Sequence, residues 1–213
     1  TIGLQPPLTV YQNRFNDFGV PSKSSNKTIS RSPQQVRSLL GKAIDFELYR
    51  SLFIHKVAIA EDFINNIVEL VLKYDEIKLL EKVNNVDRIN SISTEHIVKS
   101  EDYGDVINEI INRQITKLFY AKPSDQFEYL DNVLGISLDK EKKNKWKEVK
   151  ATRDIIVHND GIVNSTYIEK SGDLARGDIG EEVKVGENYF EQSTVRIKSL
   201  VGRISSILQE RFP

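Results

Sequence analysis

Apolar positions recur every three to four residues over long parts of the chain, which is the spacing of an α-helix with one buried face. The first such stretch follows a capping box, with Ser32 as the N-cap, Pro33 at the first helical position and Gln35 three residues after the cap. The pattern predicts a helix that runs to about Tyr74, with Gly41 as the candidate break point. Its buried face is expected to contain Phe53, Val57, Ala60, Ile64, Ile67, Val68 and Val71.

The middle of the chain is less regular. We expect a second helix over Glu76–Val83 and a polar connection over Asn84–Ser100. A further apolar stripe ends before Pro123 and is formed by Ile107, Ile110, Ile111, Ile115 and Leu118. Ser124 is expected to cap a short helix that ends near Leu134, and Gly135 is placed to stop that helix.

The C-terminal third predicts two more helices. Asp139 opens a helix that runs through Trp146 to His158, where Asn159, Asp160 and Gly161 end it. Four glycines punctuate the segment 172–186, in which Val183-Lys184-Val185 suits one short strand. The last helix covers about Asn188–Gln209 and is expected to bury Val195, Leu200, Val201, Ile204 and Leu208.

The order of these elements predicts the fold class. Strands do not alternate with helices, so we expect an all-α bundle of about five to six helices with a minor β element near 182–186. Residues 1–32 carry three prolines and a polar run at 22–27, and few periodic apolar positions. We interpret 1–32 as an extended arm that lies on the body or on a partner, and 33–213 as the helical domain.

Composition narrows the function classes. The chain has 213 residues, of which 39% are hydrophobic and 29% are charged, which suits one globular domain. It has no Cys and three His, so disulfides and cysteine nucleophiles are excluded and a His-rich metal site is not expected. No motif for ATP, metal or flavin is present, so no cofactor is expected. No apolar run reaches the ~18 residues of a membrane span, and no charged and then apolar leader opens the chain. We therefore expect a cytoplasmic protein without a membrane partner.

Charge is concentrated on one predicted helix. Between Lys140 and Arg153 there are seven basic and two acidic residues, a local net charge of +5, whereas the whole chain carries −1. In helical projection Lys143, Lys147, Lys150, Asp154 and His158 form a strip with Arg153 at its edge. Trp146, Val149, Thr152, Ile155 and Ile156 occupy the core-facing side. A charged strip by itself is most often a solvated helix face.

Arg153 and His158 add chemistry to this strip. An arginine offers a rigid fork of donors to phosphate oxygens, and a histidine transfers protons near neutral pH. His158 also lies in the last helical turn, where the helix dipole favours a protonated ring and a general-acid role. Asp154 precedes His158 by four residues and is a candidate to orient its ring. The spacing of an arginine and a histidine alone is a weak signal, since it arises by chance in roughly one sequence in seven.

The surrounding residues make the pattern more specific. The run Arg153-Asp154-Ile155-Ile156-Val157-His158, followed by Asn159-Asp160-Gly161-Ile162-Val163 and then Tyr167, resembles the R-x4-6-H motif of the HEPN superfamily. It is most similar to the bacterial standalone branch in which the motif continues as G-I-V-x-x-x-Y. The resemblance covers about residues 140–170, extends to the early helix around Phe53 and Glu61, and is absent over residues 1–32. Asn159-Asp160 departs from the variant that continues His-x-Tyr, so regulation by modification of that Tyr is not expected.

The resemblance implies a helical bundle that forms a homodimer, with two Arg/His motifs facing one cleft, and metal-independent cleavage of RNA. By that resemblance His158 is the acid/base, Arg153 holds the phosphate and the RNA 2′-hydroxyl is the nucleophile. Such proteins commonly act as toxins or in defence against phage, which implies an antitoxin or defence-system partner. Asp154, Asn159 and Glu61 are supporting candidates.

Two other functions fit the same residues. Many HEPN domains are inactive modules that bind RNA, nucleotide or a protein partner, here through the strip with Lys143, Lys147 and Lys150. A purely structural helical dimer, in which Arg153 pairs with Asp154 or Glu148, is the third hypothesis. Among the other candidates, Glu61 is more often a surface or ion-pairing residue than a member of a cleft. His55, His96 and Trp146 are best explained as a helix histidine, a surface histidine and a core residue. The glycines match no nucleotide-binding loop.

Overall fold

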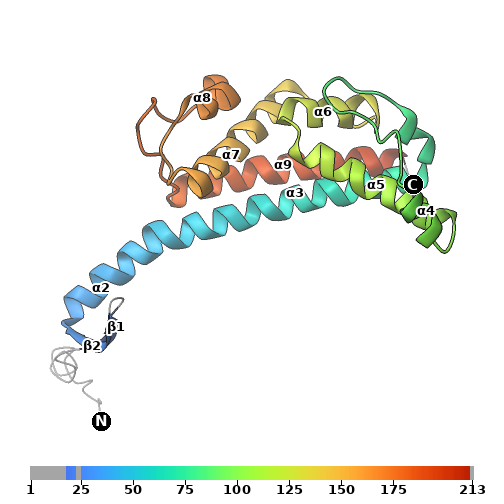
Figure 1. The fold of residues 1–213 in the computed structure, drawn as a ribbon. Helices are drawn as coiled ribbons and strands as arrows, with labels where there is room; N and C mark the ends of the chain where they lie inside the picture. Colours follow the sequence, from blue (N-terminus) through green and yellow to red (C-terminus); the bar gives the residue numbers. More distant parts are fainter. Residues whose placement is uncertain (1–17, 23–24, 212–213) are drawn as a thin grey trace, which may run out of the picture.

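A computed structural model describes residues 18–22 and 25–211 of the chain, and shows an all-α fold (Figure 1). The described residues form eight α-helices, α2 to α9, which is more than the five to six expected from the sequence. Their bounds are α2 Pro33–Lys42, α3 Tyr49–Tyr74, α4 Thr94–Lys99, α5 Tyr103–Tyr120, α6 Pro123–Asn132, α7 Lys140–His158, α8 Ser165–Ser171 and α9 Glu187–Arg211.

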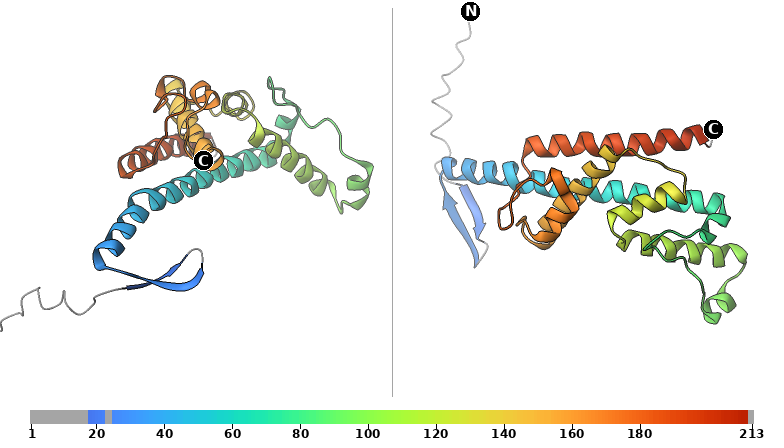
Figure 2. Two further views of the ribbon diagram at one scale, coloured as in Figure 1. Left: turned by 60° about the vertical axis from the view of Figure 1, so that its left-hand side comes forward. Right: turned by 90° about the horizontal axis from the view of Figure 1, so that it is seen from above.

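The first long helical stretch is built from three segments in line. The predicted capping box is confirmed: the Ser32 hydroxyl accepts from the Gln35 N–H and the Gln35 side chain accepts from the Ser32 N–H. α2 passes through a π-helical segment, Ala43–Leu48, into α3. The irregularity thus follows Lys42, close to the expected break at Gly41. α2 buries no residue and extends away from the bundle (Figure 2).

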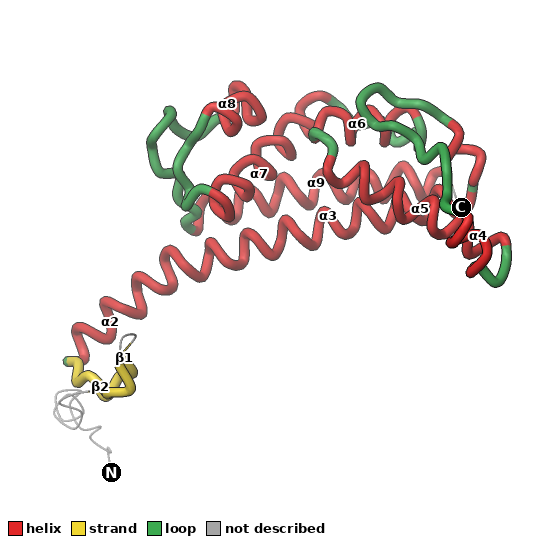
Figure 3. Tube along the Cα trace, viewed as in Figure 1, coloured by secondary structure: helices red, strands yellow, loops and turns green. Residues whose placement is uncertain are grey.

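A β-hairpin lies at the outer end of α2 (Figure 3). Strand β1, Phe18–Ser22, pairs antiparallel with strand β2, Ser25–Arg31, and the register joins Phe18 to Arg31 and Val20 to Ile29. The hairpin belongs to the segment predicted as an arm. Residues 1–17 and 23–24 of that segment lie outside the described residues.

The core lies between α3, α5, α7 and α9. α3 and α9 run side by side in the same direction, and α7 and α5 pack against them (Figures 1 and 2). Phe53 and Val57 are completely buried, and burial of side chains of this size stabilises the fold by about 1.5–3 kcal/mol each. The expected face of α3 is confirmed, with Ile64 and Ile67 packed against the core at its partly buried edge. Five apolar side chains along α2, the π-helical segment and the first half of α3 remain exposed: Leu40, Ile44, Leu48, Leu52 and Ile59.

Short elements are where the sequence predictions were wrong. The helix expected over Glu76–Val83 is a 3-10 helix over Glu76–Leu80. The connection expected over Asn84–Ser100 contains α4, which Ser93 caps by accepting from the His96 N–H. Helix α8 was not expected and is capped in the same way, by the Asn164 side chain on the Tyr167 N–H. In these two helices the cap residue, rather than an apolar period, supplies the local signal.

Two further predictions are corrected by local geometry. The N-cap of α6 is Lys122 rather than Ser124, because Pro123 occupies the first helical position. The expected stop at Gly135 is confirmed by its positive φ of 67°. Val195 is 67% exposed, because the buried face of α9 follows Tyr189, Ser193 and Ile197, and Val195 lies on the opposite side.

The β element expected near 182–186 is a single bridge between Ile162 and Glu182. Val183 also donates its N–H to Gly161 O at 2.8 Å, and Val163 donates to Glu181 O at 2.9 Å. The pairing cannot lengthen into a strand because the chain turns into α8 directly after Val163. A 3-10 helix, η3, covers Gly172–Leu174. The short contact joins the loop that follows η3 to the end of α7.

Candidate functional site

Helix α7 carries the candidate residues, and its orientation is fixed by one apolar face. Asp139 caps the helix by accepting from the Lys142 N–H, as the sequence predicts. All five residues expected on the core-facing side are buried: Trp146, Val149, Thr152, Ile155 and Ile156. The placement of this face turns Arg153, Asp154 and His158 away from the centre of the core.

A buried carboxylate ties α7 to α9. Glu148 is completely buried and accepts hydrogen bonds from the Tyr189 hydroxyl at 2.9 Å and the Thr152 hydroxyl at 2.8 Å. Arg196 forms an ion pair with the same carboxylate. Burial raises the pKa of Glu148, while the hydrogen bonds from Thr152 and Tyr189 and the charge of Arg196 act in the opposite direction. The sequence offered Glu148 as a partner for Arg153, and the structure pairs it with Arg196 instead.

Arg153 is held by two carboxylates. Glu61 on α3 is only 7% exposed and forms ion pairs with both Arg153 and Lys150, the latter at 3.0 Å. The other guanidinium nitrogen of Arg153 lies 3.1 Å from Asp154, whose second oxygen lies 3.1 Å from Lys170 on α8. Alternating charges therefore connect α7 to α3 on one side and to α8 on the other.

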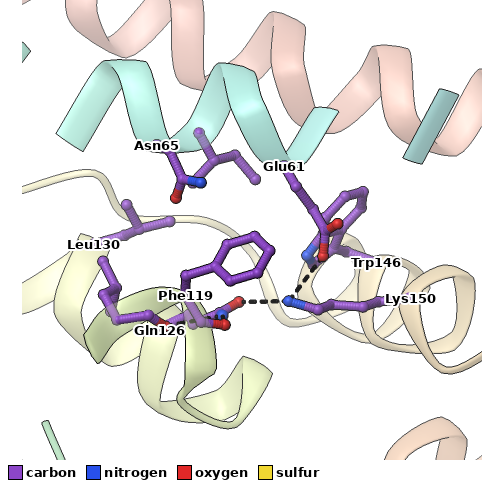
Figure 4. A pocket seen from close by; sticks show the side chains of 9 residues that line it. Glu61, Asn65, Phe119, Gln126, Leu130, Trp146 and Lys150 are labelled. Atoms are coloured by element: carbon purple, nitrogen blue, oxygen red, sulfur yellow. Dashed lines mark hydrogen bonds and ion pairs between the residues drawn. The ribbon is translucent and has the colours of Figure 1, made fainter. Parts of the chain in front are cut away.

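Figure 4 shows how Lys150 reaches this chain of charges. The Lys150 ammonium lies between Glu61 and the side-chain oxygen of Gln126, to which it donates at 3.4 Å, and 5.5 Å from the centre of the Phe119 ring. The same residues and Trp146 line a pocket of about 20 Å³. Such a volume accommodates about one water molecule, so this pocket is not a substrate site.

His158 is exposed at the C-terminus of α7. The helix ends because Asp160 and Gly161 take positive φ values of 49° and 80°, and the Gly161 N–H returns to Ile155 O at 3.0 Å. Arg50 on α3 donates to Ile156 O at 2.8 Å and lies 3.7 Å from Asp160. The last turn of α7 is therefore fixed from α3 and from the 181–183 segment, while the imidazole itself faces solvent.

The supporting residues lie elsewhere than expected. Asp154 does not orient the ring of His158, because both of its oxygens pair with Arg153 and Lys170. Within the described residues, His158 has no hydrogen bond or ion pair. Asn159 stabilises the turn by donating its side-chain N–H to Ile162 O at 2.7 Å. Glu61 is part of the site through its contact with Arg153.

The three lysines of the predicted strip have different surroundings. Lys150 is buried in the ion pair with Glu61, and Lys143 lies 3.6 Å from Asp131. Lys147 is partly exposed and has no ion-pair partner among the described residues. Only Lys147 of the three therefore presents an uncompensated charge at the surface.

A groove of about 530 Å³ lies beside the end of α7, between the π-helical segment and residues 182–185. Its charged lining is balanced, since three cations and three carboxylates contribute to it: Lys42, Arg50, Lys184, Glu47, Asp160 and Glu182. The groove thus has no preference for an anion from charge alone.

Sequence reasoning missed Arg50 and Lys170. Neither belongs to a motif, and Arg50 is 106 residues away from Ile156, which it contacts on α7. Pairing of Asp154 with Lys170 depends on α8, which the apolar pattern did not reveal. The remaining histidines lie apart: His55 is exposed on α3 and His96 lies 3.5 Å from Glu109. Among residues 18–22 and 25–211, no group of three or more His, Asp or Glu is arranged to hold a metal ion.

Over the same ranges, none of the helices has the length and apolar character needed to cross a membrane. Comparison of the chain with protein-family models, with curated proteins and with solved structures finds no match.

Proposed function

We propose that the chain is a metal-independent RNA endonuclease of the HEPN type, with Arg153 and His158 as its catalytic residues. The observation that carries the proposal is their arrangement on α7. A guanidinium oriented by two carboxylates precedes an exposed imidazole by about one and a half helical turns. This places a phosphate-binding fork and a proton-transfer group within the last two turns of the same helix.

The reaction needs no nucleophile from the protein. The 2′-hydroxyl of RNA attacks the adjacent phosphorus, and the bond from phosphorus to the 5′-oxygen breaks. The 2′-hydroxyl proton goes to a base and the departing 5′-oxygen takes a proton from an acid, which leaves a 2′,3′-cyclic phosphate and a 5′-hydroxyl. In a homodimer two copies of His158 divide these roles, and Arg153 neutralises the charge that develops on the phosphoryl oxygens.

Exposed apolar side chains near His158 support a homodimer. Val157 and Ile162 flank the end of α7 and are 45% and 37% exposed. A second subunit packed there would cover both side chains and bring a second motif to the first. As a toxin or a phage-defence effector, such an enzyme is paired with an antitoxin or another defence protein.

A non-catalytic module that binds RNA, nucleotide or protein is the second candidate. It is favoured by the ion pairs of Arg153, which already neutralise its guanidinium, and by the lack of a partner that orients His158 within the described residues. This candidate predicts binding that weakens with salt, without cleavage.

The test is incubation of wild type and His158→Ala with end-labelled tRNA and single-stranded RNA in EDTA. His55→Ala is the matched control, because His55 is an exposed histidine on another helix. We expect cleavage by wild type and by His55→Ala, with cyclic phosphate and 5′-hydroxyl ends. General acid–base catalysis contributes ~10²–10⁴-fold, so a His158→Ala rate above a tenth of wild type excludes this role. Circular dichroism checks that the variants keep their helical content.

A further inference from the structure

A second cleft lies on the other side of Asp154, between the start of α6, the middle of α7 and α8. Its volume is about 180 Å³, nine times that of the small pocket beside Lys150 and sufficient for a phosphate group. Three lysines from three different helical segments line it: Lys122, Lys147 and Lys170. Glu169 is the one carboxylate in the lining, so the net charge of the cleft is positive.

The cations of this cleft are less neutralised than four other lysines of α7, Lys142, Lys143, Lys145 and Lys150, which all form ion pairs. Lys142 forms an ion pair with the N-cap residue Asp139, and Lys145 forms one with Glu141, each about one turn earlier. Lys122 and Lys147 form none with the residues that the structure describes. Lys170 pairs with Asp154, but that carboxylate is shared with Arg153.

Polar groups between the lysines add hydrogen-bond donors. The hydroxyls of Ser124 and Thr166 lie in the lining, and the Ser124 hydroxyl has only a long contact of 3.3 Å to Asp125. Hydroxyls and ammonium groups are the usual ligands of backbone phosphates, which supply most of the affinity for nucleic acids. The groove beside the end of α7 has no such excess of positive charge.

The cleft and the proposed catalytic arginine are adjacent. Lys170 and Arg153 contact opposite oxygens of the Asp154 carboxylate, each at 3.1 Å. We propose that the cleft between Lys122, Lys147 and Lys170 binds a backbone phosphate of single-stranded RNA that neighbours the phosphate held at Arg153. The inference rests on the proposed function for its choice of RNA. A single strand is the appropriate form because attack by a 2′-hydroxyl requires rotation of the local backbone.

The experiment measures RNA binding without cleavage. A fluorescein-labelled single-stranded RNA is titrated with His158→Ala protein in EDTA, and anisotropy is recorded at several salt concentrations. The test variant adds Lys122→Gln and Lys147→Gln. The matched control adds Lys82→Gln and Lys198→Gln, which remove the same charge from two exposed lysines without ion-pair partners in the described part of the chain.

Each phosphate contact on a single strand contributes about 0.7 to the slope of log affinity against log salt. The cleft binds one phosphate, so its loss lowers the magnitude of this slope by about 0.7 and weakens binding by about 5-fold at 0.1 M salt. The control is expected to retain the slope of the parent. Equal weakening in both variants would assign the effect to net charge and overturn the inference.

The outcome separates this inference from the proposed function. Binding that depends on Lys122 and Lys147 supports the inference even where wild type does not cleave RNA. Cleavage by wild type with unchanged binding of the test variant would overturn the inference and leave the nuclease standing. Tighter binding of a polyglutamate peptide than of RNA, lost in the test variant alone, would also overturn it by identifying an acidic protein as the occupant.

Discussion

Replacement of Glu61 by Gln should destabilise the protein more than any exposed charge substitution. Glu61 is 7% exposed, and its carboxylate compensates two cations whose side chains are also largely buried, Lys150 at 11% and Arg153 at 19%. The substitution keeps the shape of the side chain and removes its charge. Lys150 is then left in a buried position next to an amide, while Arg153 retains Asp154.

The expected cost follows from burial. Removal of one partner of a buried ion pair costs about 3–5 kcal/mol. The remaining contact of Arg153 with Asp154 and the amide oxygen of the new Gln reduce this cost, so we expect the free energy of unfolding to fall by about 2–4 kcal/mol. For a chain of this length that loss lowers Tm by roughly 5–12 °C. Glu69→Gln, which breaks an exposed pair with Lys73, is the control and should change the free energy of unfolding by less than about 0.5 kcal/mol.

Urea unfolding measures the change in the free energy of unfolding for Glu61→Gln and for Glu69→Gln. Circular dichroism follows the helices and fluorescence follows the site. Trp146 is the single tryptophan of the chain, and it lines the same small pocket as Glu61 and Lys150, so its emission reports on this region. Lys150→Met and the double variant complete a cycle, in which we expect a coupling free energy of about 1–3 kcal/mol. If Glu61→Gln unfolds within 0.5 kcal/mol of wild type, the charge network contributes no stability and the argument is wrong.

Two other substitutions test the surroundings of the site. Burial lowers the pKa of Lys56 to about 8, although its ammonium donates to Phe190 O and to the Thr194 hydroxyl. Between pH 8 and 10.4 the unfolded chain binds more protons at this lysine than the folded chain does, so the free energy of unfolding of wild type should rise with pH relative to that of Lys56→Met. Urea titrations of both proteins at pH 7.5 and 9.5 measure this difference, and parallel pH profiles would contradict the reasoning. Gly161→Ala should cost about 1–3 kcal/mol in thermal unfolding, because φ is 80° and the new Cβ would lie 3.0 Å from Val183 O, whereas Gly186→Ala, with open space around it, should be neutral.

The first long helical stretch and α7 could be predicted from the sequence because each combines an apolar period with a recognisable start. Ser32 and Asp139 begin their helices as expected, and α7 buries the five residues that its pattern places inward. Shorter elements could not be found in this way. Helix α8 has seven residues, too few for a period to appear, and its beginning depends on one side chain, Asn164.

The candidate site was predictable along one helix and not across helices. The spacing of Arg153 and His158 is local, so the sequence places them correctly on α7. The contacts across helices were harder to infer, because Glu61 is 92 residues from Arg153, and Lys170, which pairs with Asp154, belongs to α8. The same limit explains why Asp154 does not orient the ring of His158 as the sequence predicted. Four residues before His158 it shares a helix face with that ring, yet two cations outside this spacing relation attract its carboxylate more strongly.

Helix nucleation explains why α2 can form although it protrudes from the bundle. A free helix of ten residues is marginal in water, because the first turn fixes many dihedral angles for one hydrogen bond. α2 has no buried residue to offset this cost, but it continues from α3, where Phe53 and Val57 anchor the chain in the core. Nucleation is therefore complete before α2 begins, and each outer residue adds only one propagation step. Amide protection should consequently decline from α3 towards Ser32, with Gly41 as the weakest step and the capping box restoring order at the far end.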